Sequence, residues 1–143
     1  MTTILVIAHT PLATALQSCV RHILPQDADQ ILALDVEAHQ SPEEIFAAAK
    51  LMTHDASELL VLTDIFGATP ANTAGRLVDD GRCQVLAGVN LPMLLRAVHY
   101  RHESLESVVT KATAGGTLGI VEVNLTAPQN QAKRSNDPRN NHH

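Results

Sequence analysis

The chain has 143 residues, enough for one domain with a sizeable core, and 45% of them are hydrophobic, which is ordinary for a globular protein. A formal net charge of −5, with no Lys/Arg cluster in the first 125 residues, argues against binding to a nucleic-acid backbone. Only 2% of the residues are aromatic, which also argues against stacking of single-stranded bases on aromatic side chains.

The start of the sequence and its two cysteines favour a cytoplasmic protein. Residues 1–5 have neither the basic region nor the cleavage site of a signal peptide, and no apolar run is long enough to span a membrane. Cys19 and Cys83 stand in apolar surroundings without the spacing of metal ligands. We expect both to be buried free thiols.

The chain opens with a strand that leads into a helix. Residues 4–7 are four consecutive aliphatic residues, which is typical of a strand covered on both faces in a parallel sheet. His9 stands at the carboxyl end of this strand. Thr10 can cap the next helix, and Pro11 suits its first position because a proline there loses no hydrogen bond. The helix is predicted over residues 11–24 from apolar residues at helical spacing, namely Leu12, Leu16, Cys19, Val20 and Ile23.

Three more strand–helix units follow in the sequence. The strands are predicted over residues 31–36, 59–64 and 83–89. The helices after them are predicted to start at Ser41-Pro42, Thr69-Pro70 and Asn90-Leu91-Pro92, and the first and last of these helices to reach about His54 and Tyr100. Strands that alternate with helices imply right-handed βαβ crossovers. The predicted fold class is therefore α/β, with a mainly parallel sheet between two layers of helices.

The last predicted elements are a helix and a strand. The helix covers residues 104–114, Gly115-Gly116 is expected to end it, and residues 117–123 predict a final strand. From Thr126 the composition changes to Pro, Gln, Asn, Lys, Arg and His, which cannot bury enough apolar surface to order a segment. We therefore expect one domain over residues 1–125 and a disordered polar tail over residues 126–143.

Three strand-to-helix turns should open on the same edge of this sheet, because the carboxyl ends of parallel strands share an edge. They cover residues 9–11, 64–70 and 88–92. Each leads into a helix start, where unpaired backbone N–H groups and the helix dipole favour an anion. The sequence therefore predicts an anion pocket built without Lys or Arg, with His9 and Asp64 as its only base and acid.

His9 and Asp64 can form a catalytic pair. A carboxylate that accepts a hydrogen bond from one ring nitrogen of His9 fixes the tautomer and leaves the other nitrogen as a nucleophile. Beside an anion pocket the natural electrophile is a phosphoryl group, whose transfer needs mainly positioning and charge stabilisation. Candidate ligands for its oxygens are the hydroxyls of Thr10 and Thr69 and the N–H groups of residues 68–71. A histidine or an aspartate at a strand end can equally be structural, and spacing alone leaves that alternative open.

Three segments carry a resemblance to a known family. They lie within residues 7–16, 63–72 and 87–94 and contain the runs Ile7-Ala8-His9, Asp64-Ile65-Phe66-Gly67-Ala68-Thr69-Pro70 and Gly88-Val89-Asn90-Leu91-Pro92-Met93. With these runs the chain resembles the enzyme IIA component of the mannose/fructose type in the bacterial phosphoenolpyruvate-dependent sugar phosphotransferase system (PTS). The likeness extends over about residues 1–123. It implies a three-layer αβα sandwich whose sheet has the order 2-1-3-4 plus a C-terminal edge strand.

The resemblance also implies a role as a phosphocarrier. It implies that His9 takes a phosphoryl group from the histidine-containing phosphocarrier protein HPr, with Asp64 as its hydrogen-bond partner. The group then passes to a IIB component for sugar uptake and phosphorylation. A cytoplasmic homodimer is implied as well, in which the C-terminal strand takes part. By position, the residues that line or shape the site are Thr10, Phe66, Gly67, Thr69, Pro70 and Asn72, and the expected phosphate ligands are Thr10, Gly67, Ala68, Thr69 and Asn72.

Two positions depart from the family pattern. Thr10 stands where many relatives have a glycine after the active histidine, and Ala68 replaces the second glycine of the 64–70 loop. Because alanine does not readily adopt a positive φ, the backbone at Ala68 must take a different shape from the one that a glycine would allow.

Two other functions remain open at this point. A regulatory IIA-like protein without a dedicated permease keeps the same site and acts by phosphorylation-dependent binding to a partner. The phosphotransfer subunit of dihydroxyacetone kinase shares the expected fold, although the runs at residues 66–70 and 88–93 favour the mannose type. No His or Cys set has the spacing of a metal site, and no Gly-x-Gly-x-x-Gly follows the first strand, so we expect neither a metal nor another cofactor.

Overall fold

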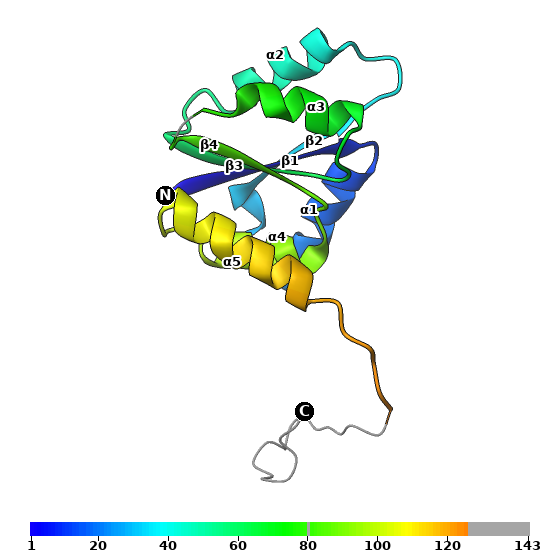
Figure 1. Cartoon of the computed structure of the whole chain (residues 1–143), viewed down its shortest axis with the longest axis vertical. Coiled ribbons are helices and arrows are strands. Elements are labelled where there is room, and N and C mark those ends of the chain that lie inside the picture. The colour runs from blue at the N-terminus through cyan, green and yellow to red at the C-terminus, as the bar shows by residue number, and fades with distance from the viewer. Residues whose placement is uncertain (80, 126–143) are drawn as a thin grey trace.

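Four parallel strands form a single sheet at the centre of the molecule, with helices on both of its faces (Figure 1). The computed structural model describes residues 1–79 and 81–125. The strand order is β2-β1-β3-β4, which confirms the predicted α/β sandwich and the order 2-1-3-4. The strands are β1 (Thr2–His9), β2 (Ile31–Val36), β3 (Glu58–Thr63) and β4 (Cys83–Ala87). The polar tail expected over residues 126–143 lies outside the described residues.

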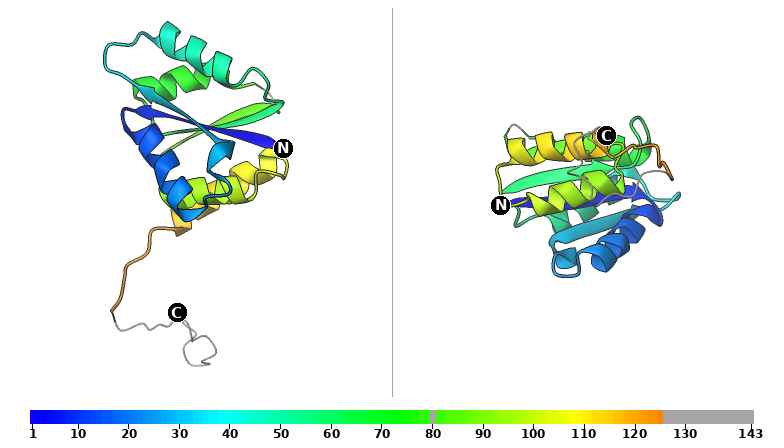
Figure 2. Two further views of the ribbon diagram at one scale, coloured as in Figure 1. Left: turned by 180° about the vertical axis from the view of Figure 1, so that it is seen from behind. Right: turned by 90° about the horizontal axis from the view of Figure 1, so that it is seen from below.

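Two layers of helices cover the sheet, as the views from behind and from below also show (Figure 2). On one face lie α1 (Leu12–Ile23), α4 (Leu91–His99) and α5 (Leu105–Leu118), and on the other lie α2 (Pro42–Met52) and α3 (Thr69–Ala74). The described residues also contain two short 3₁₀ turns, η1 (Ala28–Gln30) and η2 (Gly75–Leu77). In the part of the chain that the structure describes, no helix combines the length and hydropathy needed to cross a membrane.

Strand β1 is buried on both faces, as its run of aliphatic residues predicts. Ile4 and Val6 belong to the core under α1, α4 and α5, whereas Leu5 and Ile7 belong to the core under α2 and α3. All four side chains are fully buried, and each contributes about 1.5–3 kcal/mol to folding by the removal of apolar surface from water. The central position of β1 therefore fixes where its last residue, His9, emerges from the sheet.

Three helices start with a side chain that caps them. The predicted start at Ser41 is confirmed, since its hydroxyl accepts a hydrogen bond from the Glu44 N–H (3.1 Å) and the Glu44 carboxylate accepts one from the Ser41 N–H (2.8 Å). Asn90 caps α4 by accepting from the Met93 N–H (2.9 Å), and Ser104 caps α5 in the same way. These local bonds explain why α2, α4 and α5 begin where they do.

The predicted starts of α1 and α3 are each wrong by one residue. The Thr10 N–H donates to the Val36 carbonyl (3.0 Å), so the pairing of β1 with β2 continues past His9 and Pro11, not Thr10, becomes the residue before the helix. In α3, Thr69 is already helical and the preceding cap position belongs to Ala68. Neither helix has a capping side chain of its own at that position.

The predicted break at Gly115-Gly116 and the predicted strand over residues 117–123 are also wrong. Helix α5 continues to Leu118, and no strand follows it in the described residues. The glycines serve the contact between α4 and α5. A Cβ at Gly115 would collide with the stem of Arg96, and a Cβ at Gly119 would come within 2.7 Å of Pro92. Close helix packing, not helix breaking, accounts for these glycines.

Helix α1 buries fewer of its apolar residues than their spacing suggests. Ala13, Leu16 and Val20 are buried, whereas Leu12 and Ile23 at its two ends are 37% and 44% exposed. The prediction of two buried thiols is right for Cys83 and wrong for Cys19, which is exposed. The core covers only the arc of α1 that carries its three buried residues, so an apolar neighbour beside that arc stays in contact with water.

Candidate functional site

His9 and Asp64 meet at the carboxyl edge of the sheet. His9 is the last residue of β1, and Asp64 follows the last residue of β3, the strand that pairs with β1 in parallel. The Nδ1 atom of His9 lies 2.7 Å from Oδ2 of Asp64, so the expected contact between the two side chains is present. The same Oδ2 accepts a hydrogen bond from the His9 backbone N–H (2.9 Å). Asp64 therefore holds both the backbone and the ring of His9.

The side chains of His9 and Asp64 differ in exposure, and this difference suits an exposed nucleophile that is supported by a more buried carboxylate. The side chain of His9 is 55% exposed, whereas that of Asp64 is 13% exposed. The other carboxylate oxygen of Asp64 accepts a hydrogen bond from the Ile65 N–H (3.0 Å). Because Nδ1 is occupied by Asp64, Nε2 is the ring nitrogen that remains to react with a molecule arriving from solvent.

The lowered pKa of Asp64 favours an ionised acceptor beside the ring of His9. Partial burial raises the pKa of Asp64, but hydrogen bonds from the His9 backbone N–H and ring, together with the positive charge that His9 can carry, outweigh burial and hold the pKa below its ordinary value. An ionised Asp64 accepts a hydrogen bond from the Nδ1–H group, and in that tautomer the lone pair is on Nε2. The geometry thus sets up a nucleophilic imidazole whose developing positive charge faces a carboxylate.

The loop after Asp64 is shaped by one glycine and one asparagine. Gly67 has φ +92°, which a residue with a side chain rarely adopts, whereas Ala68 is extended with φ −91°. The backbone at Ala68 is thus compatible with an alanine. Asn72 closes the loop, since its Nδ2 donates to the Gly67 carbonyl (3.2 Å) and its N–H donates to the Ala68 carbonyl (2.9 Å).

The structure divides the expected phosphate ligands into two groups. Gly67, Ala68, Thr69 and Asn72 belong to this loop and to the start of α3, beside Asp64 in sequence. Thr10 follows His9 directly, and its backbone N–H is already bound to the Val36 carbonyl, so its hydroxyl is the group that remains for a ligand. The third predicted turn is tied inward, because the N–H groups of Gly88 and Val89 both donate to the Thr63 carbonyl at 2.9 Å.

This edge also carries a second acid, which lies outside the three predicted turns. Asp35 stands near the end of β2, opposite Ala8 of β1. Its carboxylate accepts hydrogen bonds from the Thr14 N–H (3.1 Å) and from the Thr14 hydroxyl (2.7 Å). An acid at the end of a predicted strand was the available signal, since every parallel strand ends at the same edge.

Exposed apolar side chains also stand close in sequence to His9 and Asp64. Ile65 and Phe66, which follow Asp64, are 56% and 89% exposed, and Leu12 at the start of α1 is 37% exposed. Such side chains are favourable at a surface that docks another protein. From the sequence, Phe66 is expected at the site only because the family resemblance implies it.

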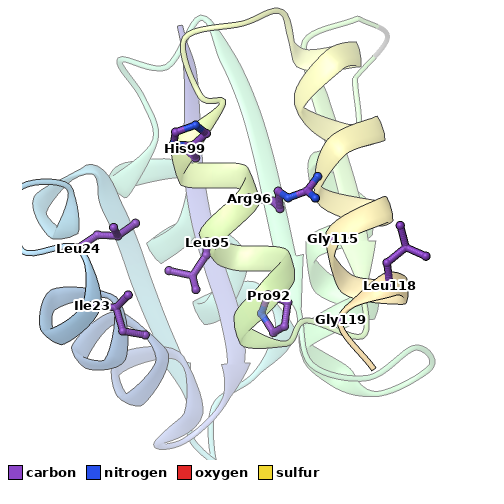
Figure 3. Close-up of a pocket in the computed structure, with 9 residues that line it drawn as sticks. All are labelled: Ile23, Leu24, Pro92, Leu95, Arg96, His99, Gly115, Leu118 and Gly119. Carbon is purple, nitrogen blue, oxygen red and sulfur yellow. The ribbon is translucent and has the colours of Figure 1, made fainter. Parts of the chain in front are cut away.

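A separate hollow of about 440 Å³ lies where the end of α1 approaches α4 and α5 (Figure 3). None of the candidate site residues lines it, so it is distinct from the pair of His9 and Asp64. Its lining residues are Ile23, Leu24, Pro92, Leu95, Arg96, His99, Gly115, Leu118 and Gly119. Within residues 1–79 and 81–125, no three His, Cys, Asp or Glu side chains come together in a group that could hold a metal ion.

Comparison with curated proteins gives relatives in one system. The chain is 36% identical over 80 residues to the PTS system fructose-specific EIIA component of Bacillus subtilis, a match that covers 54% of this chain and 55% of that protein. It is 37% identical over 65 residues to the PTS system mannose-specific EIIAB component of Escherichia coli, a match that covers 43% of this chain and 20% of that protein. The chain thus spans about half or less of the length of these relatives.

Comparison with solved structures supports the same fold. The PTS component EIIA of Streptococcus agalactiae matches with a TM-score of 0.79 and 30% identity, over 85% of this chain and 97% of that chain. The mannose/sorbose-specific IIA subunit of Enterococcus faecalis matches with a TM-score of 0.80 over 88% of this chain and 97% of that chain, and its 21% identity makes this a likeness of fold alone. The family described as "PTS system fructose IIA component" matches residues 3–113. The chain therefore belongs to the mannose/fructose IIA family of the PTS, whose members are phosphotransferase components.

Proposed function

We propose that the chain is a histidine phosphocarrier that accepts a phosphoryl group on Nε2 of His9 from phosphorylated HPr. The observation that carries this proposal is the 2.7 Å contact between Nδ1 of an exposed His9 and Asp64. The Nε2 lone pair attacks phosphorus, and the phosphorus–nitrogen bond to the donor breaks. Its electron pair returns to the donor imidazole. Asp64 stabilises the positive charge that grows on the His9 ring during the attack.

The phosphoryl oxygens are proposed to bind the chain through backbone and hydroxyl groups. The Thr10 hydroxyl reaches them from the His9 side, and the N–H groups of Gly67 and Ala68 with the Thr69 hydroxyl reach them from the loop after Asp64. Asn72 supports that loop through the Gly67 carbonyl (3.2 Å). Oriented neutral donors suit a group that must leave again, because they hold the phosphate without a bound cation.

The next step is transfer to a IIB component in the cytoplasm for sugar uptake and phosphorylation. A nucleophile of the IIB acceptor attacks phosphorus, and the bond from phosphorus to Nε2 of His9 breaks. The electron pair of that bond returns to the His9 imidazole. The exposed side chains of Leu12, Ile65 and Phe66 beside His9 provide an apolar rim on which both protein partners can dock in turn.

A homodimer is also part of this proposal. Strand β4 is at the edge of the sheet, and the segment after α5 is rich in exposed apolar side chains. Val121, Val123 and Leu125, which alternate along that segment, are 71%, 86% and 96% exposed. An extended segment with this alternation can pair with an open strand edge of a second copy, where its apolar side chains become buried.

Labelling with phosphoenolpyruvate tests the proposal. The chain is incubated with enzyme I, HPr and ³²P-labelled phosphoenolpyruvate, and label is expected on the wild-type protein and on His22→Ala, which removes another exposed histidine. His9→Ala is expected to carry no label. Label on His9→Ala would place the chemistry elsewhere. Addition of candidate IIB proteins then tests the second transfer, and label that passes to none of them would favour a regulatory role.

A further inference from the structure

We propose that Asp35 is a positioning residue for phosphoryl transfer, which acts from β2 by clamping the first turn of α1 behind His9. This inference rests on the proposed function, because the step that it assists is the attack by His9. Asp35 lies opposite Ala8, the residue before His9, in the parallel pairing of β1 with β2. It therefore reaches α1 from the strand next to the histidine.

The clamp replaces a helix cap that the sequence does not supply. Pro11 occupies the position before α1 and has no side-chain group that can accept a hydrogen bond, so the first-turn N–H groups lack a local partner. Asp35 accepts the Thr14 N–H through Oδ1 (3.1 Å) and the Thr14 hydroxyl through Oδ2 (2.7 Å). A negative group is also favourable at the N-terminus of a helix. Ser41, Asn90 and Ser104 cap their own helices, whereas the first turn of α1 depends on Asp35 of strand β2.

The residue after Asp35 holds the chain on the other side of Pro11. The Val36 carbonyl accepts the Thr10 N–H (3.0 Å), so two consecutive residues of β2 bind the chain just before and just after Pro11. Only Thr10 and Pro11 separate His9 from α1. Movement of α1 relative to β2 is therefore transmitted directly to Thr10, whose hydroxyl is a proposed phosphate ligand, and to the backbone of His9.

The chain offers a substitution that removes the charge of Asp35 and keeps the clamp. In Asp35→Asn, the amide oxygen still accepts the Thr14 N–H. The amide NH₂ can donate to the Thr14 hydroxyl, which then turns to donate to the Pro11 carbonyl, already 3.3 Å away. Asp35→Ala removes both bonds. Thr14→Val removes only the hydroxyl bond, and it keeps the question open to measurement if Asp35→Ala does not fold.

The test measures the rate at which phosphorylated HPr labels each variant. Asp35→Ala is expected to lower kcat about five- to tenfold, the size of effect that loss of a helix cap can have when it bears on a reaction barrier, and Thr14→Val about threefold. Asp35→Asn is expected to stay within about twofold of wild type, and KM for phosphorylated HPr to stay unchanged, because the clamp orients the nucleophile. Asp55→Ala, which removes a 91% exposed carboxylate after α2, is the matched control.

Amide hydrogen exchange separates failure of the clamp from failure of the proposed function. In the unphosphorylated protein, the Thr10 N–H is expected to exchange about tenfold faster in Asp35→Ala than in wild type and to recover in Asp35→Asn. Absence of label on His9 in the wild type would end the proposed function and leave this measurement intact. A wild-type kcat in folded Asp35→Ala, an equal loss in Asp35→Asn, or a loss confined to KM would overturn the clamp.

Discussion

The carboxyl edge of the sheet and the segment after α5 differ in how many contacts their side chains make within one copy of the chain. At the edge, Asp64 binds the ring and backbone of His9, Val36 binds Thr10, and Asp35 binds Thr14. After α5, the large apolar side chains of the segment are 71–96% exposed, and they are those of Ile120, Val121, Val123 and Leu125. The first region is held by hydrogen bonds within one chain, whereas the second carries apolar surface that another surface could bury.

This difference makes the proposed chemistry and the proposed dimer separable by substitution. A site held by contacts within one chain keeps its geometry whether or not the chain associates. A segment that needs a second surface affects association first and the site only indirectly. Variants in each region should therefore change one property and leave the other close to wild type.

Among the variants that keep His9, Asp64→Asn is expected to have the largest effect. An amide cannot stabilise the positive imidazole, so phosphorylation by HPr should slow about 100-fold, the cost typical of removing one group that stabilises a transition state. The oligomeric state should not change. Rapid-quench labelling and sedimentation measure the two properties, and unchanged labelling kinetics would remove Asp64 from the mechanism.

Charges in the segment after α5 should break association and spare the site. Val121→Asp combined with Val123→Asp places two carboxylates among the apolar positions that alternate along this segment. Burial of unpaired charges is unfavourable by several kcal/mol. The dissociation constant of the proposed dimer should therefore rise at least about 30-fold, as measured by sedimentation equilibrium. Glu122→Ala on the alternate positions is the control. A wild-type dimer in the double variant would exclude the segment from the interface.

The sequence was sufficient where local chemistry decides the structure. The aliphatic run of β1 predicted a strand buried on both faces, and Ser41-Pro42 predicted the start of α2. The meeting of His9 and Asp64 could be expected for the same reason, because parallel neighbouring strands end together and each residue stands at a strand end. Both inferences needed only periodicity and the rule of shared edges.

The sequence was insufficient where distant segments decide the structure. Glycine disfavours a helix interior by its intrinsic preference, yet Gly115 and Gly116 lie inside α5. They face α4, where a Cβ at Gly115 would collide with Arg96 and one at Gly116 would crowd Met93. The start of α1 was misplaced because the Val36 carbonyl draws Thr10 into the sheet. Asp35 was overlooked because its partner, Thr14, lies 21 residues earlier in the chain.

A substitution in the contact between α5 and α4, just before the segment after α5, is expected to have a smaller effect. Gly115→Ala places a Cβ against the stem of Arg96, and we expect a loss of about 1–2 kcal/mol in the free energy of unfolding from overpacking. Gly75→Ala has open space around it and serves as the matched control. Urea denaturation measures both. Combination with Arg96→Ala should recover most of the loss, and failure to recover would locate the strain in the backbone contact with Pro92 instead.

The smallest expected effect is the pH dependence that Asp64 gives to the carboxyl edge. Its pKa is lower in the folded protein than in the unfolded chain, so the folded state gains stability that is present in full above the ordinary aspartate range near pH 4. That stability is lost as the pH falls through the lowered pKa. In urea denaturation from pH 6 to pH 3, the free-energy difference between wild type and Asp64→Asn should therefore shrink. Asn72→Ala removes a contact from the same edge without removing an acid, so its difference from wild type should stay constant over this range. A difference for Asp64→Asn that also stays constant would show that the carboxylate gains nothing from its ionised form in the fold, and the assignment of the Nδ1 proton of His9 to a charged acceptor would fail with it.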